Sequence, residues 1–421
     1  MQISVYGSGY LGSIISACLA DFGMPVTCFD EDIDRIREVA QGNIPFFEKN
    51  LQEVIRRNVR AGRLSYSTDL ASAAAKSQVT FIAEDTASGI EGLALKIAQL
   101  SQPRTLLVLS SPVPVGTASK LQKLMQEQGR IVAIVSQPLF FTNGCAIEDF
   151  NWPDRILLGT NSADAVMILK QLYRPLVMRG VPVIVTNHET AELVREASTA
   201  FVATKIAFIN ELASLSEHVH ADATDLALAL GLDKKIAPRC LQPGAGFGGP
   251  FAESDLDSLA QLANGNGVSL RIVSAARDVN RTLADRLADK ISRMVVNIQG
   301  KELGILGLAF KPNTNSIAGS SSILLARTLM EKGAQVRAYD PVAIPEAQSQ
   351  IEGIRYCNSP YATAEGSDAL VVGTGWPEFR ALDFDRIKKL LKQPIIVDTK
   401  NLLDSVRLRS MGFQYVGVGR A

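Results

Sequence analysis

The sequence has no surplus of charge of either sign and no long hydrophobic run. Its 421 residues include 43 Lys and Arg against 43 Asp and Glu. Proteins that bind nucleic acid or anionic membranes usually concentrate basic residues in a positive patch. The longest apolar runs, such as ILLARTLM, are far shorter than the roughly 20 residues of a membrane-spanning helix. We therefore predict no nucleic-acid partner and no membrane partner.

Cysteine and histidine are also scarce, and their spacing shows no metal-binding pattern. His218 and His220 lie two residues apart, so on a helix they would not share a face. The chain begins directly with an apolar strand, which predicts no signal peptide. The five cysteines are scattered without the spacing of a disulfide framework, which is typical of a reducing cytoplasm; they are Cys18, Cys28, Cys145, Cys240 and Cys357. We predict a cytoplasmic protein without a bound metal.

Glycines, in contrast, are concentrated at one turn near the N-terminus. Residues 1–30 read as an apolar strand, a glycine turn, a helix and a second strand that ends at Asp30. Such a turn lets the backbone approach a pyrophosphate, while a carboxylate at the second strand accepts hydrogen bonds from a ribose diol. A carboxylate there repels a 2′-phosphate, which favours NAD over NADP. The predicted NAD-binding residues are Gly7, Gly9, Tyr10, Leu11, Gly12, Asp30 and Thr86.

The same strand–turn–helix–strand pattern occurs again near the C-terminus. From Glu302, ELGILGLAFKPNT leads through a helical segment to the strand AQVRAYD, which ends at Asp340. Short Val- and Ile-rich runs follow in both halves and indicate parallel sheets buried on both faces. Between the halves, residues 188–230 have helical periodicity without Gly or Pro for about thirty residues, with apolar positions on several sides. The predicted fold is α/β, with two Rossmann-like doubly wound parallel-sheet domains joined by a long central helix.

Motifs along the whole chain resemble those of the UDP-glucose/GDP-mannose dehydrogenase family, the nucleotide-sugar 6-dehydrogenases. They include GNIPFFE at 42–48, PVPVGT at 112–117, GFGG at 246–249 and GLAFKPNT at 307–314. The resemblance implies an NAD-binding domain at 1–187, a central helical dimerisation domain with the glycine loop at 188–295, and a nucleotide-sugar-binding domain at 296–421. It also implies a homodimer and a nucleotide-sugar substrate, with a UDP-sugar favoured.

Enzymes of this family oxidise the C6 alcohol of the sugar to a carboxylate in two hydride transfers, through a cysteine-bound thioester. Alignment of the glycine loop places Phe251 at the cysteine and Ser254 at the oxyanion lysine, while Asp255 matches. Other family positions are also substituted; they hold Pro112, Leu139, Asn143, Arg195, Thr199, Lys235, Asn315, Ser316, Ala318 and Lys400. Because phenylalanine cannot form a covalent adduct, the sequence argues against the thioester route.

Two polar residues remain as candidates for catalysis. Asp255 is a candidate base, and Arg195 is a candidate ligand for a carboxylate or phosphate. Each also has a structural interpretation: Asp255 as a carboxylate at a helix N-terminus, and Arg195 in a surface ion pair with Glu192 or Glu196. The predicted substrate-binding residues are Lys235, Gly246, Phe247, Gly248, Gly249, Phe251, Phe310 and Lys311.

Three functional hypotheses follow from this pattern. The first is an NAD-dependent oxidoreductase that performs a different reaction, such as a two-electron oxidation, on a nucleotide sugar. The second is a non-catalytic relative that binds nucleotide as a partner subunit. The third is an ordinary UDP-sugar 6-dehydrogenase in which a displaced thiol, Cys145 or Cys240, captures the aldehyde. For both thiols the competing interpretation is a small buried hydrophobic residue.

Overall fold

The computed structural model describes residues 1–420, which form two compact units. The first, Met1–Ala197, contains an eight-stranded sheet in the order β3-β2-β1-β4-β5-β6-β7-β8. The first six follow the order of dinucleotide-binding Rossmann domains. The antiparallel pairing of β6 with β7 reverses the direction of β7 and β8 relative to the parallel strands β1 to β6. The strands are β1 (Ile3–Tyr6), β2 (Val26–Phe29), β3 (Leu64–Ser67), β4 (Val79–Ile82), β5 (Leu106–Leu109), β6 (Ala133–Ser136), β7 (Ile156–Gly159) and β8 (Val183–Thr186).

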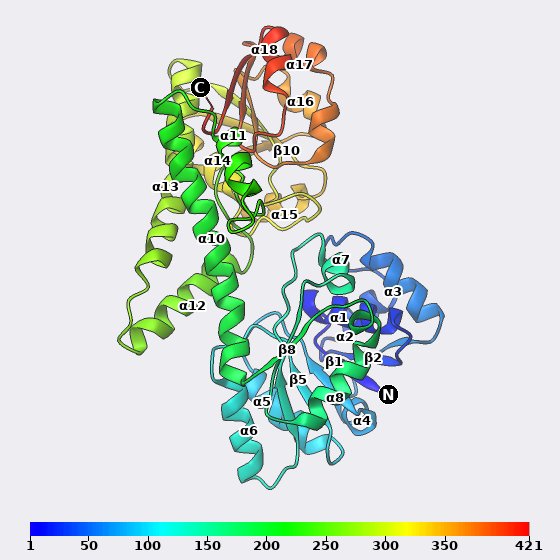
Figure 1. The fold of residues 1–421 in the computed structure, drawn as a ribbon. Helices are drawn as coiled ribbons and strands as arrows, with labels where there is room; N and C mark the ends of the chain where they lie inside the picture. Colours follow the sequence, from blue (N-terminus) through cyan, green and yellow to red (C-terminus); the bar gives the residue numbers. More distant parts are fainter. Residues whose placement is uncertain (421) are drawn as a thin grey trace. The chain divides into compact units, whose positions relative to one another are not determined.

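Helices cover both faces of this sheet, whose central strands are mostly apolar and buried at every position. Strands β1, β4 and β5 are buried throughout. One core layer joins the sheet to α1 (Tyr10–Asp21), α3 (Leu51–Arg60), α7 (Ala146–Asn151) and α8 (Ala163–Leu172). The other layer joins it to α4 (Leu70–Lys76), α5 (Ile90–Leu100) and α6 (Thr117–Glu127) (Figure 1). Two short helices, α2 (Ile33–Ala40) and α9 (Arg174–Val177), complete the unit.

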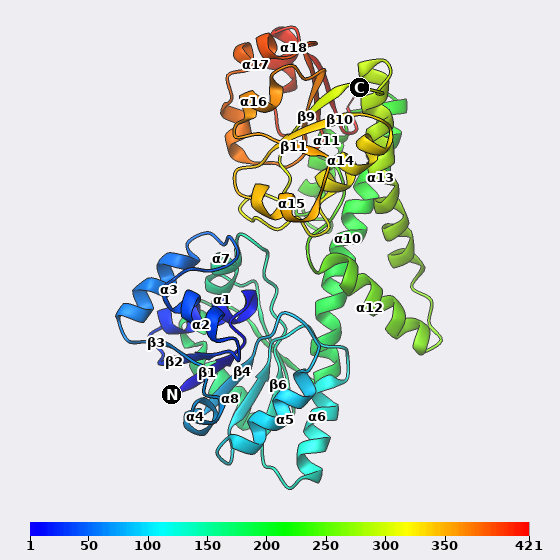
Figure 2. The ribbon, with the colours of Figure 1, turned by 180° about the vertical axis from the view of Figure 1, so that it is seen from behind.

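The second unit begins at Ser198 and contains an all-parallel six-stranded sheet in the order β11-β10-β9-β12-β13-β14 (Figure 2). A single large core joins this sheet to its surrounding helices. Its strands are β9 (Glu302–Leu306), β10 (Gln335–Tyr339), β11 (Ile354–Tyr356), β12 (Ala369–Val372), β13 (Ile395–Asp398) and β14 (Gln414–Gly417). The helices that follow β9 in the sequence are α14 (Ser321–Glu331), α15 (Ile344–Gln350), α16 (Pro360–Ala364), the 3₁₀ helix η1 (Pro377–Ala381), α17 (Phe384–Leu390) and α18 (Ser405–Ser410).

The predicted long central helix is α10 (His188–His218), with 31 residues. Three further helices follow it, α11 (Ala223–Leu232), α12 (Ala252–Gly265) and α13 (Arg271–Val295). Phe201, Phe208 and Leu215 are 67%, 52% and 56% exposed on α10, and their seven-residue spacing places them on one face of the helix. Within the described residues, none of these helices has the length and hydropathy needed to span a membrane.

Candidate functional site

The glycine turn follows β1, which lies between β2 and β4 in the sheet. The order of the strands along the sheet reverses its direction at β1. Ligands of open α/β sheets bind at this kind of switch point. Gly7 has a φ of +102°, which disfavours any residue with a side chain. A Cβ on Gly12 would lie 1.8 Å from the carbonyl oxygen of Gly7. The turn is therefore tight enough that both positions require glycine.

Asp30 lies at the end of β2, beside this turn. Its carboxylate accepts hydrogen bonds from Ser8 N at 2.9 Å and Ser8 Oγ at 2.7 Å, and from Asp32 N at 3.0 Å. Burial alone would raise the pKa of Asp30, but these hydrogen bonds and Arg35 lower it below its ordinary value. Asp30 is therefore an ionised acceptor in the position predicted for binding a ribose diol.

Two acidic residues that the sequence analysis overlooked follow β4 at the same edge of the sheet. The Asp85 carboxylate accepts hydrogen bonds from Tyr10 N at 2.8 Å and Leu11 N at 3.0 Å. Burial and the charges of Asp30 and Asp85 raise the pKa of Glu84. The available signal was an acidic pair directly after the buried strand VTFI, because the carboxyl ends of neighbouring parallel strands meet at one edge. Thr86, a predicted cofactor residue, is exposed in the loop that follows.

Tyr10 connects the glycine turn to the loop GNIPFFE. Its hydroxyl donates to Glu48 at 2.7 Å, and its ring packs edge-on against Phe46. Glu48 is buried and accepts hydrogen bonds from Gly144 N and Ala146 N at the start of α7. The Tyr10 side chain therefore has a structural role, and its predicted contribution to cofactor binding would come from its backbone N–H.

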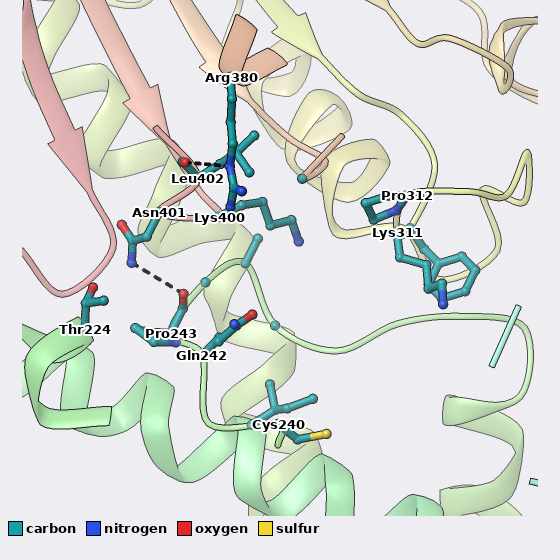
Figure 3. A pocket seen from close by; sticks show the side chains of 16 residues that line it. Thr224, Cys240, Gln242, Pro243, Lys311, Pro312, Arg380, Lys400, Asn401 and Leu402 are labelled. Atoms are coloured by element: carbon teal, nitrogen blue, oxygen red, sulfur yellow. Dashed lines mark hydrogen bonds between the residues drawn. The ribbon is translucent and has the colours of Figure 1, made fainter. Parts of the chain in front are cut away.

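The second unit contains a cavity of about 450 Å³. Figure 3 shows Arg380, Lys400 and Asn401 on one side of it and Lys311 on the other. Burial lowers the pKa of Lys400 to about 8, although Asp398 acts in the opposite direction. Its lining residues are Ile206, Thr224, Cys240, Gln242, Pro243, Gly244, Ala245, Gly246, Phe310, Lys311, Pro312, Gly375, Arg380, Lys400, Asn401 and Leu402. Three basic side chains that line one cavity favour an anionic ligand.

The predicted substrate-binding residues divide into two groups. Gly246, Phe310 and Lys311 line the cavity. Lys235 is exposed beyond the end of α11, and the rest lie outside the described lining; they are Phe247, Gly248, Gly249 and Phe251. Arg380 and Gln242 also line the cavity, although the sequence analysis did not select them.

The close approach made by the glycine loop is to the chain itself. A Cβ on Gly248 would lie 1.9 Å from the carbonyl oxygen of Gly319. Asn280 Nδ2 donates to Phe247 O at 3.0 Å, while Asn280 Oδ1 accepts from Phe247 N at 2.8 Å. Gly248 therefore packs against the backbone of the chain itself, and its contribution to substrate binding stays a prediction.

Comparison with known proteins shows matches over the full length of the chain. Family models for the NAD binding domain, the central domain and the UDP binding domain of the UDP-glucose/GDP-mannose dehydrogenase family match residues 1–177, 189–282 and 304–405. The chain belongs to this family. It is 38% identical to a UDP-glucose 6-dehydrogenase of Rhizobium meliloti over 100% of both chains. It is 35% identical to UDP-glucose 6-dehydrogenase TuaD of Bacillus subtilis, over 100% of this chain and 93% of that protein.

Solved structures of family members have the same architecture. A UDP-glucose dehydrogenase from Pyrobaculum islandicum superimposes with a TM-score of 0.91 at 29% identity, covering 100% of this chain and 98% of that one. These matches confirm the predicted α/β fold with two Rossmann-like domains, the predicted NAD cofactor and the predicted class, an NAD-dependent oxidoreductase. The glycine turn and Asp30 fit that cofactor.

The two candidate catalytic residues lie in different surroundings within the family fold. Asp255, in the first turn of α12, is 3% exposed and accepts a hydrogen bond from Thr199 Oγ1 at 2.9 Å. The Arg195 side chain is 16% exposed and lies 3.9 Å from Glu196 Oε1, so the predicted surface ion pair is wrong about exposure. Glu192 caps α6 by accepting hydrogen bonds from Gly116 N and Ala118 N.

The two candidate thiols also differ from the expectation of buried hydrophobic residues. Cys240 is exposed and lines the cavity of the second unit, so that expectation is wrong for Cys240. Its φ of +64° is unusual for a residue with a side chain. Cys145 is half-buried at the N-cap position of α7.

Proposed function

We propose that the protein binds a UDP-sugar and oxidises it by a two-electron reaction that does not pass through a thioester. The observation that carries the proposal is the cavity in the second unit, in which Lys311, Arg380 and Lys400 surround a space of about 450 Å³. A nucleoside diphosphate brings two phosphate groups, which match several cationic donors. The cavity lies in the part of the chain that matches the family's central and UDP binding domains.

The oxidation requires a hydride acceptor, a proton acceptor and no covalent nucleophile. The glycine turn and Asp30 would hold NAD, which would supply the hydride acceptor. Asp255 is the proposed acceptor of the alcohol proton, because its carboxylate is buried at 3% exposure and oriented by the Thr199 hydroxyl. Phe251, at the position of the family's nucleophile, leaves the aldehyde or ketone as the product. The proposed reaction therefore consumes one NAD⁺ for each sugar.

The stoichiometry of NADH tests this proposal. Purified protein is screened by thermal shift with UDP, UDP-sugars and GDP-sugars, with and without NAD⁺, and each stabilising ligand is then assayed for NADH absorbance. The proposal predicts one NADH per sugar and a carbonyl product. Thermal stabilisation without any NADH would instead support a non-catalytic nucleotide-binding subunit, and two NADH per sugar with a carboxylate product would contradict the proposal.

A second candidate function is an ordinary 6-dehydrogenase with a displaced thiol. Its support is the exposure of Cys240 at the cavity. This hypothesis predicts two NADH per sugar and loss of turnover in Cys240→Ser, with Cys357→Ser as the control, because Cys357 lies away from the described cavity lining. Retention of full turnover in Cys240→Ser would exclude Cys240 as the thiol that captures the aldehyde.

The role of the cavity is tested separately from catalysis. Lys400→Met removes one of the three cations, and we expect a loss of UDP affinity of roughly tenfold, the size typical of one charge-assisted hydrogen bond. Lys389→Met is the matched control, because Lys389 is exposed on α17. Equal UDP affinity in the two variants would place the nucleotide elsewhere.

We also propose that a second copy of the chain covers the apolar face of α10 formed by Phe201, Phe208 and Leu215. These side chains are more than half exposed, and a regular row of large apolar residues is typical of a helical subunit interface. Phe208→Glu should convert a dimer into a monomer in light-scattering chromatography, whereas Leu324→Glu, an exposed leucine on α14, should not. A monomeric wild-type protein would contradict this proposal.

A further inference from the structure

The first turn of α1 is capped by the carboxylate of Asp85, which lies in the loop after β4. Asp85 Oδ2 lies 2.8 Å from Tyr10 N, and Asp85 Oδ1 lies 3.0 Å from Leu11 N. A Cβ on Gly9 would lie 2.1 Å from Asp85 Oδ2. The carboxylate therefore occupies the space beside the bare glycine, in direct contact with the N-terminus of the helix.

These N–H groups are the ones that the glycine turn offers to the cofactor. In dinucleotide-binding domains, the pyrophosphate lies at the N-terminus of the first helix and accepts hydrogen bonds from its free N–H groups. An N–H group engaged by Asp85 is not available to a pyrophosphate. The Asp85 carboxylate and a pyrophosphate bound to the same N–H groups would also repel each other, because both are negatively charged. Asp85 and the cofactor pyrophosphate consequently compete for the same donors.

The surrounding charges add to this competition. Asp30 and Glu84 lie at the same edge, and the charges of Asp30 and Asp85, together with burial, raise the pKa of Glu84. Arg35, 3.4 Å from Asp30 Oδ2, is the cation that acts on both Asp30 and Glu84. Three carboxyl groups thus lie around a site that must accept a doubly charged pyrophosphate.

In the second unit Asp340, the counterpart of Asp30, shows how firmly a carboxylate can be held at a glycine turn. There Asp340 is 2% exposed and accepts hydrogen bonds from Leu308 N, Ala309 N and Trp376 Nε1. Asp85 is only partly buried and is followed by an exposed loop. In the described chain its carboxylate accepts the two hydrogen bonds from α1. Asp85 can therefore leave its position at a much smaller cost than Asp340.

We propose that Asp85 is an affinity-determining residue of the cofactor site, where its carboxylate acts as an internal competitor for the pyrophosphate. In the free protein Asp85 caps α1, and cofactor binding requires Asp85 to give up both N–H groups. The effect depends on the pyrophosphate. It therefore applies equally to NAD⁺ and to ADP-ribose and does not apply to adenosine, which lacks phosphate.

The test compares Asp85→Ala with the wild type in two measurements. Loss of the cap should lower the melting temperature of the free protein. The same substitution should tighten binding of NAD⁺ and ADP-ribose by about 5- to 30-fold in isothermal titration calorimetry, which corresponds to roughly 1–2 kcal/mol. Adenosine affinity should change less than about twofold on the same reasoning. A variant that is less stable when free but binds the cofactor more tightly is not expected from structural damage.

Asp69→Ala is the matched control. Asp69 is the N-cap of α4 in the same unit and accepts a hydrogen bond from Ser72 N at 3.1 Å. This variant should also melt earlier, but its NAD⁺ affinity should equal that of the wild type. If Asp85→Ala does not fold, Asp85→Asn tests the same point, because it keeps an oxygen acceptor without the charge and should give a smaller increase in affinity.

Two results would overturn the proposal. One is an NAD⁺ affinity in the Asp85 variants that is unchanged or weaker than that of the wild type, including the case in which neither protein binds NAD⁺. The other is an equal increase in affinity in Asp69→Ala.

Discussion

Nucleotide binding in the second unit should depend on pH through Lys400. Burial lowers the pKa of this side chain to about 8, and the amine lines the cavity beside Lys311 and Arg380. A diphosphate binds the protonated amine, so binding raises the pKa of Lys400. UDP affinity should therefore be highest at pH values below about 8, and it should fall as the pH rises through that value.

The size of the effect follows from the fraction of Lys400 that is protonated. With a pKa of about 8, the amine is about nine-tenths charged at pH 7 and about one-tenth charged at pH 9. UDP affinity should thus drop about tenfold between these pH values, a loss of about 1.4 kcal/mol. Over the same range, UDP binding should be accompanied by proton uptake.

Isothermal titration calorimetry with UDP at pH 7, 8 and 9 measures both quantities, if each titration is repeated in two buffers that differ in ionisation enthalpy. Lys400→Arg is the control, because a guanidinium stays charged throughout this range. Titration of UDP itself is common to both proteins and cancels in the comparison. Parallel pH profiles for the wild type and Lys400→Arg would refute the reasoning.

Three further predictions concern Gly12 in the glycine turn, its acidic neighbour Glu84, and Phe251, which aligns with the family's cysteine. Gly12→Ala should destabilise the protein by about 2 kcal/mol or more in chemical denaturation, because its Cβ would lie 1.8 Å from a carbonyl oxygen, whereas Gly92→Ala meets open space and should be neutral or slightly stabilising. Glu84→Gln should melt later than the wild type at neutral pH, and the difference should vanish well below pH 4.5, because a carboxyl group with a raised pKa destabilises the fold only when ionised. Phe251→Cys combined with Ser254→Lys should not produce two NADH per sugar, since the family's glutamate positions still lack acids; production of UDP-sugar acid by this variant would disprove that.

The features that the sequence predicted well are those set by local patterns. The glycine turn, the acidic end of β2 and the thirty-residue helical segment all follow from neighbouring residues. Buried strands and their alternation with helices then restrict the topology to a few choices. The antiparallel pairing of β6 with β7 has no local signature, so the sequence did not predict it.

The features that the sequence missed are contacts between distant segments. Asp85 reaches α1 across 74 residues, and Asn280 reaches the glycine loop across 33. Each contacts a segment for which the sequence had predicted a ligand. A glycine-rich motif indicates that something approaches closely, but it does not say whether that partner is a substrate or the chain's own backbone, as at Gly248.

The cavity takes all of its lining from residues between Ile206 and Leu402, and the contacts of the glycine turn come from the first 85 residues. The residues of the cavity and those of the glycine turn thus lie in separate stretches of the sequence. Substitutions at the reactive positions can therefore accumulate without changing either site. A new reaction can then evolve in a protein that keeps both sites.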